Sequence, residues 1–438
     1  MSLSYFGTDG IRGRAYESPL SLSEVARWGR AWGQVAGSRG ISNLVLGWDP
    51  RTSSEPMAEA FLRGLGNFRS TVLGVVPTPA VAWLAQQTPQ AWGVMLSASH
   101  NPPEDNGIKG FNRLGEKLEE DEERAIEAAF GCSADPGPPF PPLRVDSDPV
   151  GRYLAHLGSV ALPDDFPVVV DCAHGATAPF AAGVLRGALG WVGVPADGKR
   201  INVGVGSTHL GALREAVIAA NAELGIALDG DGDRCLLLDS RGELVDGDQM
   251  LWLLAQDRLE AGEPLPGVVG TVMTNGALEA ALASRGVAFV RTPVGDKFLL
   301  RELQARGWDL AAEASGHLIQ KREGPSGDGL ATAKAVLRAL LRRPKPERWS
   351  WRFEPWPLKL VNLRAKERRA VEDCKALRAA MAELEARHGG VDGSLRLVVR
   401  WSGTEAKLRL MVEAREPALL ASAMRSLETA ARADLGMS

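Results

Sequence analysis

The first 130 residues alternate between segments with helical spacing of apolar positions and short, fully apolar runs. Ser21 and Glu24 form a capping-box pattern that predicts the start of a helix, and a second helical pattern covers residues 55–65. The apolar runs are typical of buried strands and lie at 44–46, 71–76 and 93–96. Strands that alternate with helices in this way predict a mostly parallel sheet covered by helices.

The same rhythm continues through the next two hundred residues. A second group combines a strand at 168–170, a helix at 207–223 with Ser207 as its cap, and strands at 226–228 and 235–238. A third group combines strands at 268–273 and 287–290 with helices at 276–285 and 296–306. Both groups therefore predict further α/β layers.

The pattern changes near the C-terminus. Residues 395–400 and 407–412 alternate around a short turn, which predicts a hairpin, and a helix is expected from 417 to 435. Proline-rich breaks at 136–142, 264–266 and 344–357 separate the groups. The chain is therefore expected to contain three α/β domains with mixed sheets and one α+β domain. Their expected bounds are 1–149, 150–258, 259–350 and 351–438.

Composition narrows the classes of protein. The 438 residues carry 50 Lys and Arg against 54 Asp and Glu, a net charge of −4 without a basic tail, which argues against a nucleic-acid partner. No apolar run reaches the roughly 18 residues that a membrane span needs. The four cysteines are scattered without a CxxC pair, which is typical of a cytoplasmic protein and argues against both a disulfide framework and a zinc-thiolate site.

The most specific local motif is Asp-Gly-Asp-Gly-Asp-Arg at 229–234. Asp229, Asp231 and Asp233 alternate with glycines that let the backbone curl, so three carboxylates can converge on a hard divalent cation. An EF-hand would need a glutamate where Ser240 stands, so that kind of calcium site is excluded. The competing interpretation is an inert, solvated turn.

A second motif, Ser-Ala-Ser-His-Asn-Pro at 97–102, follows the apolar run 93–96. Ser99 would lie at the carboxyl end of a strand, where α/β proteins place their sites, and it could be a nucleophile. His100 and Lys109 are groups that could assist it. An ordinary Asn-Pro turn is the alternative.

Further segments could bind phosphate or sugar. The predicted hairpin turn contains Arg400, Ser402, Gly403 and Thr404, and Arg409 follows on the return strand; these are the parts of a phosphate clamp, or of a plain turn. Residues 7–13 form a glycine-rich segment that presents Arg12.

Residues 313–317 form another candidate for sugar binding. Glu313, Ser315 and His317 would share one face if the segment were extended, and that face could bind sugar hydroxyls; a surface loop is an equal alternative. The stretch 193–200 resembles a P-loop, but it lacks the final Ser or Thr and no helix is expected after it. A P-loop phosphate site is therefore rejected here.

Together these motifs resemble the α-D-phosphohexomutase family, and within it the bacterial phosphoglucosamine mutases. The resemblance runs from Phe6 to about Val412. The segment 97–102 resembles the family's phosphoserine loop, 229–234 its magnesium loop, 313–317 its sugar-specificity loop and 400–405 its phosphate-binding loop. This resemblance implies four domains around a central cleft.

The resemblance also implies an activity. Phosphoserine at Ser99 would transfer its phosphoryl group to a hexose phosphate through a sugar 1,6-bisphosphate, which also acts as activator, and so interconvert glucosamine 6-phosphate and glucosamine 1-phosphate. One Mg²⁺ would be held by Ser99, Asp229, Asp231 and Asp233. The implied catalytic residues are Ser99, Lys109, His100 and Arg234. The implied substrate-binding residues are Arg12, Lys297, Glu313, Ser315, His317, Arg400, Ser402, Gly403, Thr404 and Arg409.

Some questions stay open from the sequence. The general base could be Lys109, His100 or His317, with a preference for Lys109. Trp401 and Ala406 replace the usual prolines of the phosphate-binding loop, and Lys297 replaces a common arginine. A phosphoglucomutase or phosphomannomutase is the nearest alternative, and a non-catalytic sugar-phosphate binder is a more distant one. The oligomeric state is also open, with a homodimer as one candidate.

Overall fold

The computed structural model describes residues 3–66, 68–132, 143–365, 368–389, 393–401 and 407–436. Two compact units make up the chain. Unit 1 contains residues 1–271 and 290–351, and unit 2 contains residues 272–289 and 352–438. The proline-rich break expected at 136–142 lies outside the described residues.

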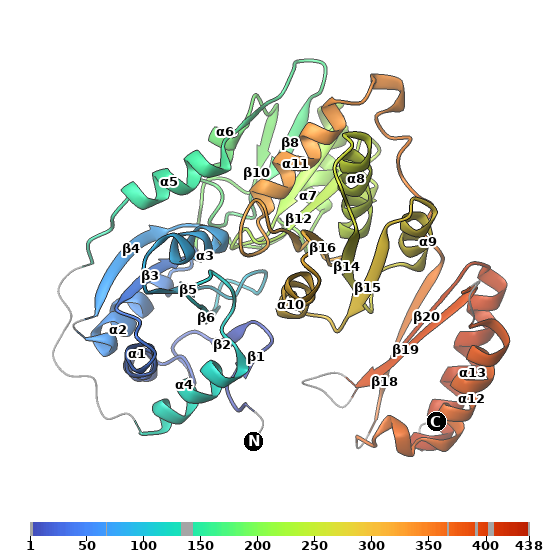
Figure 1. Cartoon of the computed structure of the whole chain (residues 1–438), viewed down its shortest axis with the longest axis horizontal. Coiled ribbons are helices and arrows are strands. Elements are labelled where there is room, and N and C mark those ends of the chain that lie inside the picture. The colour runs from blue at the N-terminus through green and yellow to red at the C-terminus, as the bar shows by residue number, and fades with distance from the viewer. Residues whose placement is uncertain are drawn as a thin grey trace. The chain divides into compact units, whose positions relative to one another are not determined.

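The first sheet of unit 1 has six strands in the order β1-β2-β6-β5-β3-β4 (Figure 1). These strands are β1 (Phe6–Gly7), β2 (Gly10–Arg14), β3 (Asn43–Trp48), β4 (Arg69–Val75), β5 (Ala91–Leu96) and β6 (Asp105–Phe111). The helices of this layer are α1 (Leu22–Ser38), α2 (Ser54–Leu65), α3 (Thr78–Gln87) and α4 (Glu120–Cys132). As the capping box predicts, the Ser21 side chain accepts a hydrogen bond from the Glu24 amide.

The expectation of a mostly parallel first sheet is wrong. Only β3–β4 and β3–β5 are parallel, whereas β1–β2, β2–β6 and β5–β6 are antiparallel. The reason is the connection from β5 to β6, which spans residues 97–104 and contains no helix. So short a connection returns the chain antiparallel, because a parallel crossover needs about a dozen residues. It is also the segment that carries Ser99.

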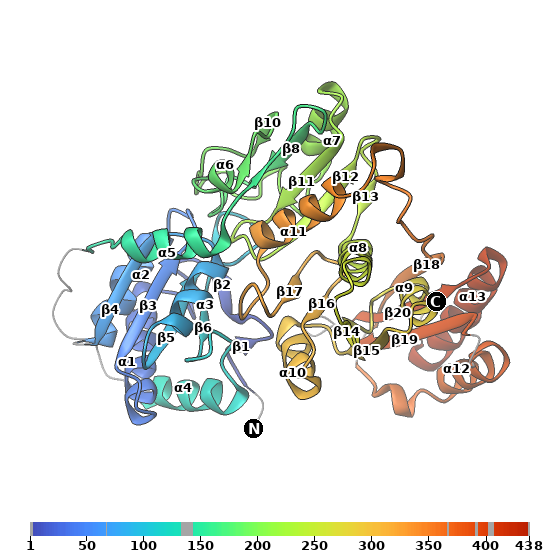
Figure 2. The same ribbon diagram turned by 45° about the horizontal axis from the view of Figure 1, so that its top comes forward.

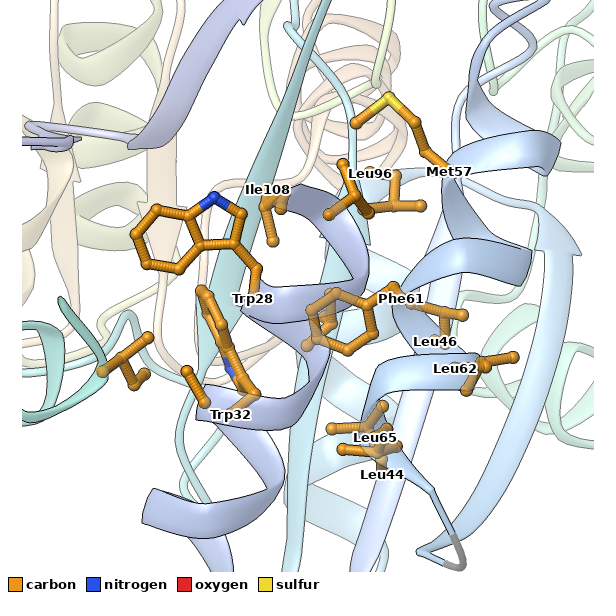
Figure 3. Packing of buried hydrophobic residues seen from close by; sticks show 14 of the residues in the cluster. Trp28, Trp32, Leu44, Leu46, Met57, Phe61, Leu62, Leu65, Leu96 and Ile108 are labelled. Atoms are coloured by element: carbon orange, nitrogen blue, oxygen red, sulfur yellow. The ribbon is translucent and has the colours of Figure 1, made fainter. Parts of the chain in front are cut away.

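The core of this layer lies between the sheet and the helices α1, α2 and α4 (Figure 3). Trp28 and Trp32 of α1 are fully buried there, and Trp28 stacks on Phe130 of α4 at a centroid distance of 3.6 Å. Burial of each large apolar side chain stabilises the fold by about 1.5–3 kcal/mol. This packing gives the strand ends, and the loops that follow them, a rigid support.

The second sheet of unit 1 has the order β10-β8-β11-β12-β13. Its strands are β8 (Val168–Asp171), β10 (Gly190–Val192), β11 (Leu224–Leu228), β12 (Cys235–Asp239) and β13 (Leu244–Val245). The other elements of this layer are α5 (Asp148–Leu157), β7 (Val160–Ala161), α6 (Ala181–Val184), β9 (Leu185–Arg186) and α7 (Gly211–Ala219). Helix α7 packs against β8 and β11 (Figure 2). The loop 229–234 joins the antiparallel neighbours β11 and β12.

The expected helix at 207–223 is shorter in the structure, and Ser207 does not cap it. Helix α7 begins at Gly211 after Leu210, without a side-chain cap. The Ser207 amide instead donates to the Leu228 carbonyl oxygen at 3.1 Å, which keeps this segment beside the end of β11. The helix ends before Asn221, which has a left-handed φ of 46°.

The third sheet has the order β15-β14-β16-β17. Its elements are α8 (Gly247–Glu260), β14 (Gly267–Thr271), β15 (Ala288–Thr292), α10 (Asp296–Arg306), β16 (Leu310–Ala312), β17 (Leu318–Gln320), α11 (Gly329–Leu341) and the short helix η1 (Lys345–Glu347). Helix α10 packs on β14 and β16, and α11 packs back on β11 and β12 of the second sheet. The turn between β16 and β17 contains residues 313–317.

Unit 2 contains a three-stranded antiparallel sheet in the order β18-β20-β19. Its elements are α9 (Gly276–Ser284), β18 (Leu358–Arg364), the short helix η2 (Val371–Asp373), α12 (Lys375–His388), β19 (Leu395–Trp401), β20 (Lys407–Ala414) and α13 (Pro417–Leu435). The predicted hairpin and terminal helix are both confirmed. Helices α12 and α13 cover one face of the sheet. The stretch 272–289, expected in the third α/β domain, clusters with this unit.

Among the helices of the described residues, none is long and apolar enough to cross a membrane. The longest, α13, has 19 residues. It buries Met424, Leu427 and their neighbours against the sheet of unit 2 and exposes charged residues on its other side.

Candidate active site

Three loops of unit 1 meet at one place, and each follows a strand of a different sheet. Ser99 follows β5, the aspartates follow β11, and residues 313–317 join β16 to β17. An isolated bridge between Arg234 and His317 connects the last two loops. The Ser99 hydroxyl reaches the aspartate loop directly. The structure therefore brings together segments that lie more than two hundred residues apart in the sequence.

The three aspartates form a candidate metal centre. One carboxylate oxygen from each of Asp229, Asp231 and Asp233 lies within 4.8 Å of the others, and all three residues are buried. The Oδ1 atoms of Asp231 and Asp233 are buried without a hydrogen-bond partner among the described residues. Burial and repulsion from Asp233 and Asp231 raise the pKa of Asp229 well above its ordinary value. Hard oxygen donors with unused lone pairs and mutual repulsion fit a divalent cation such as Mg²⁺.

The glycines of this loop have different roles. Gly232 adopts a left-handed φ of 75°, as the sequence pattern predicts. Gly230 does not need that conformation. A Cβ atom there would lie 2.6 Å from the Ser99 carbonyl oxygen, so only glycine lets the two loops approach this closely.

Ser99 lies against the metal centre. Its hydroxyl donates to Asp229 Oδ2 at 2.7 Å, and its Oγ lies 3.2 Å from His100 Nδ1. The residue is fully buried and has a left-handed φ of 53°, which is uncommon for a residue other than glycine. The adjacent His100 therefore does face the hydroxyl, although neighbouring residues seldom do.

Lys109 carries a positive charge into the aspartate cluster. Its Nζ atom lies 2.7 Å from Asp231 Oδ2, 3.5 Å from Asp233 Oδ2 and 2.9 Å from Asp9 Oδ2. Burial disfavours the ammonium form, but these carboxylates outweigh burial and raise the pKa of Lys109. The arrangement therefore favours the form that cannot accept a proton, and it gives no support to the preference for Lys109 as general base.

Two guanidinium groups flank the Ser99 loop. Arg12 Nη1 lies 3.4 Å from the Asn101 side-chain oxygen, and Arg234 Nε lies 3.8 Å from Asp233 Oδ1. Burial, together with the charges of Arg234 and Arg12, lowers the pKa of His100 to about 4. His100 is therefore neutral near pH 7, and the two arginines supply positive charge where a phosphate on Ser99 would need it.

The segment 313–317 is a tight turn rather than an extended segment, so simple alternation does not place Glu313, Ser315 and His317 on one face. Gly316 has a left-handed φ of 92°, and its amide donates to the Glu313 carbonyl oxygen at 3.0 Å. The turn still brings two expected groups together, because the Ser315 hydroxyl donates to Glu313 Oε2 at 3.2 Å. His317 Nδ1 lies 3.8 Å from Asp233 Oδ1. Lys297 instead faces Glu123, with Nζ 3.9 Å from Oε2.

Unit 2 has a basic pocket of its own, of about 310 Å³. It lies on the sheet face opposite α12 and α13, because its strand residues alternate with those of the core. Arg400 and Arg409 are direct cross-strand neighbours there, and burial together with Arg409 lowers the pKa of Arg400. A bound anion would relieve this repulsion. Ser402, Gly403 and Thr404 lie outside the described residues.

Sequence reasoning missed several residues of the site. Lys117 forms ion pairs with Asp9 and with Asp296, and the distance from its Nζ atom to Asp296 Oδ2 is 2.6 Å. The Thr78 hydroxyl donates to Asp231 Oδ2 at 2.5 Å. Lys407 lines the pocket of unit 2. None of these residues belongs to a local motif, apart from Asp9, which stands in the glycine-rich segment beside Arg12.

Comparison with known protein families identifies four matching models along the chain. They are described as phosphoglucomutase/phosphomannomutase, alpha/beta/alpha domain I at residues 3–134, domain II at 152–242, domain III at 246–349, and the C-terminal domain at 360–428. Together they cover most of the chain, in the order and number of domains that the sequence analysis expects.

Curated relatives match over nearly the whole length. A phosphoglucosamine mutase of Alcanivorax borkumensis is 39% identical over 439 residues, with 98% of both chains covered. One of Burkholderia thailandensis is 40% identical over 438 residues, covering 95% of this chain and 96% of the relative.

Solved structures share the fold. A phosphoglucomutase/phosphomannomutase family protein from Burkholderia thailandensis has a TM-score of 0.82 at 24% identity, covering 99% of this chain and 98% of the other. An Aspergillus fumigatus N-acetylphosphoglucosamine mutase, solved in complex with GlcNAc-6P and magnesium, has a TM-score of 0.60 at 18% identity, covering 99% and 96%.

Proposed function

The chain belongs to the phosphoglucomutase/phosphomannomutase family of α-D-phosphohexomutases, and we propose on that premise that it is a phosphoglucosamine mutase. It would interconvert glucosamine 6-phosphate and glucosamine 1-phosphate. The observation that carries this proposal is the contact of the buried Ser99 hydroxyl with Asp229 inside a cluster of three aspartates. A nucleophile beside a cation site is what phosphoryl transfer requires.

The proposed reaction has two balanced transfers. In the first, the bond from phosphorus to Ser99 Oγ breaks, a bond to a sugar hydroxyl oxygen forms, and the hydroxyl proton passes to a general base. The product is a bound sugar 1,6-bisphosphate. After this intermediate turns over in the site, its other phosphoryl group returns to Ser99, and the proton returns to the sugar oxygen that is released.

The residues around Ser99 support these steps by charge. Asp229, Asp231 and Asp233, with an oxygen on Ser99, would hold one Mg²⁺, whose charge offsets that of the transferring phosphoryl group. Arg12 and Arg234 would hold phosphate oxygens, and Lys109 would add a third cation. The proton acceptor would be Lys109, His100 or His317. His100 lies against the Ser99 hydroxyl, and His317 lies against Asp233.

Two further groups of residues would bind the substrate. Glu313 and Ser315 would bind hydroxyls, and Lys297 and His317 would complete that part of the site. Arg400, Arg409, Ser402, Gly403 and Thr404 would bind the phosphate that does not react. We also propose domain bounds of 1–149, 150–258, 259–350 and 351–438. Because all four cysteines are free thiols, we propose a cytoplasmic location, and a homodimer is the assembly to test.

A substrate panel is the test of the proposed function. With Mg²⁺ and a trace of sugar 1,6-bisphosphate, the protein is expected to convert glucosamine 6-phosphate faster than glucose 6-phosphate or mannose 6-phosphate. The measurement is the initial rate on each substrate at equal concentration. A preference for glucose or mannose would favour a phosphoglucomutase or phosphomannomutase, and no turnover of any of them would leave a sugar-phosphate binder.

Replacing Arg400 by alanine is expected to raise KM for the sugar phosphate by about 10- to 100-fold with a smaller change in kcat. The reason is that a charge-assisted hydrogen bond to a phosphate contributes about 1.5–3 kcal/mol. Steady-state kinetics give both constants. Arg378→Ala is the matched control, because Arg378 lies on α12, which covers the opposite face of the sheet, and it should keep both values. An unchanged KM in Arg400→Ala would contradict the proposed role.

A further inference from the structure

Ser99 is held in an unusual backbone conformation by contacts to both of its backbone polar groups. Its amide donates to Ser97 Oγ at 2.8 Å. Its carbonyl oxygen accepts from Arg51 Nη2 at 3.0 Å and from Asn202 Nδ2 at 2.8 Å. A residue other than glycine keeps a left-handed φ only where its surroundings over-determine it. These three side chains are the groups that do so here.

Arg51 extends this hold over the whole loop that connects β5 to β6. Nη2 also donates to the Asn101 carbonyl oxygen at 2.8 Å. Nη1 donates to the carbonyl oxygens of Pro102 and Asp105, the latter at 2.9 Å. Four backbone carbonyls, from Ser99 to Asp105, therefore converge on one guanidinium group, which is completely buried.

Asp49 fixes the guanidinium group in turn. Its Oδ2 atom accepts from Arg51 Nε at 2.9 Å and from Ser97 Oγ at 2.6 Å. Arg51 therefore uses all five of its N–H donors, which form a rigid planar fork. The same carboxylate accepts from Ser97 Oγ, which in turn accepts from the Ser99 amide. Asp49 and Arg51, which follow β3, therefore fix both the amide and the carbonyl oxygen of Ser99.

A second arm comes from a different part of unit 1. Asn202 is buried, and its Nδ2 atom donates to the carbonyl oxygens of Ser99 and Asn101 at 2.8 and 3.0 Å. These are two of the four carbonyls that Arg51 holds. Arg51 and Asn202 thus donate to the same loop backbone. Within the described part of the chain, neither side chain hydrogen-bonds with the Ser99 hydroxyl or with Asp229, Asp231 or Asp233.

We propose that Arg51 is a positioning residue for phosphoryl transfer, with Asn202 as its second arm. It acts through the loop backbone to keep Ser99 Oγ aimed at the metal centre, where the hydroxyl lies 2.7 Å from Asp229 Oδ2. This inference rests on the proposed function. A displacement of the reacting oxygen by about 1 Å can cost on the order of 100-fold in rate.

The test compares Arg51→Met and Arg51→Lys with wild-type protein. In Arg51→Met, kcat per phosphorylated protein is expected to fall about 100-fold, while KM changes less than about threefold, because the substrate contacts are intact. Arg51→Lys keeps the charge but cannot reach four carbonyls, so it should recover only part of the loss. Intact mass gives the phosphorylated fraction in each sample.

Two further variants separate positioning from plain stability. Arg258→Met removes another buried arginine of unit 1, whose Nη2 atom lies 2.6 Å from Asp309 Oδ2 and which, among the described residues, has no bond to the Ser99 loop. This variant should therefore lower thermal stability but keep kcat. Asn202→Gly removes the second arm and tolerates the left-handed φ of 62° at that position. It is expected to lower kcat less than Arg51→Met does. If Arg51→Met is insoluble, the kcat values of Asn202→Gly and Arg51→Lys test the positioning role instead.

Opposite results would overturn the inference. If Arg51→Met and Arg51→Lys keep kcat within about threefold of wild type, or if Arg258→Met loses as much kcat at the same drop in melting temperature, Arg51 is not a positioning residue. If wild-type protein turns over no hexose phosphate, the proposed function fails as well, and the wild-type assay alone reveals that case.

Discussion

Replacing Ser99 by alanine is expected to abolish mutase turnover, lowering kcat by about four orders of magnitude or more. In the proposed reaction this hydroxyl carries the phosphoryl group between the two transfers. It donates to Asp229, whereas the Thr78 hydroxyl, which also contacts the aspartate cluster, donates to Asp231. Removal of a covalent nucleophile in other enzymes costs up to about 10⁶-fold. The measurement is the rate on glucosamine 6-phosphate with bisphosphate activator.

Intact mass provides a second readout of the same variant. Wild-type protein treated with a sugar 1,6-bisphosphate should contain a species heavier by one phosphoryl group, and Ser99→Ala should lack it. Ser38→Ala is the control, because Ser38 is an exposed serine of α1 whose hydroxyl contacts only the Val35 carbonyl oxygen among the described residues. Phosphorylation that persists in Ser99→Ala would move the nucleophile elsewhere.

Replacing Asp229 by asparagine is expected to lower kcat by about three orders of magnitude and to remove the response to Mg²⁺. Asparagine keeps the size of the side chain, so it can still hydrogen-bond with Ser99 Oγ, but it takes one negative charge from the metal centre. Chelation of the metal from wild-type protein should have a similar effect on the rate.

Thermal unfolding tests the same variant without an activity assay. Ligand binding to the folded state stabilises wild-type protein by about 2.7 kcal/mol at a Mg²⁺ concentration 100-fold above Kd, and Asp229→Asn should lose this gain. Burial and like charges raise the folded-state pKa of Asp229, so its ionised form destabilises the cation-free protein at neutral pH. A permanently neutral asparagine removes that loss, and the cation-free variant should therefore be no less stable than wild type.

A neighbouring aspartate serves as the control for both experiments. Asp239 is also buried at the end of β12, but it binds the backbone amides of Arg241 and Glu243 and lies outside the triad. Asp239→Asn should keep the stabilisation by Mg²⁺. An equal Mg²⁺ effect in Asp229→Asn, or full turnover by chelated wild-type protein, would contradict the proposed metal site.

The parts of the site that the sequence predicted are those encoded within a few adjacent residues. The alternation of aspartate and glycine at 229–234 is sufficient to indicate a cation site. The apolar run 93–96 is sufficient to predict that Ser99 lies at the carboxyl end of a strand. The capping box at Ser21 likewise requires no distant partner. Local chemistry and local backbone geometry are sufficient in each of these cases.

Other features depend on contacts between distant segments, and no local pattern could reveal them. Arg51 is an isolated arginine in the sequence, and its role emerges only where four carbonyls of residues 99–105 surround it. The antiparallel course of β6 was also missed, because the alternation of strands and helices does not show which connection lacks a helix. The turn at 313–317 depends on the left-handed Gly316.

The ammonium group of Lys109 amid the aspartates has a consequence for how the protein is assembled. Its charge offsets part of the repulsion among the carboxylates, so we expect unit 1 to fold without a divalent cation. Folding first and loading the metal afterwards lets the ion exchange with the surroundings without unfolding of unit 1. If the site binds Mg²⁺ as proposed, removing the ion would leave the protein folded but inactive, and adding it back would restore turnover.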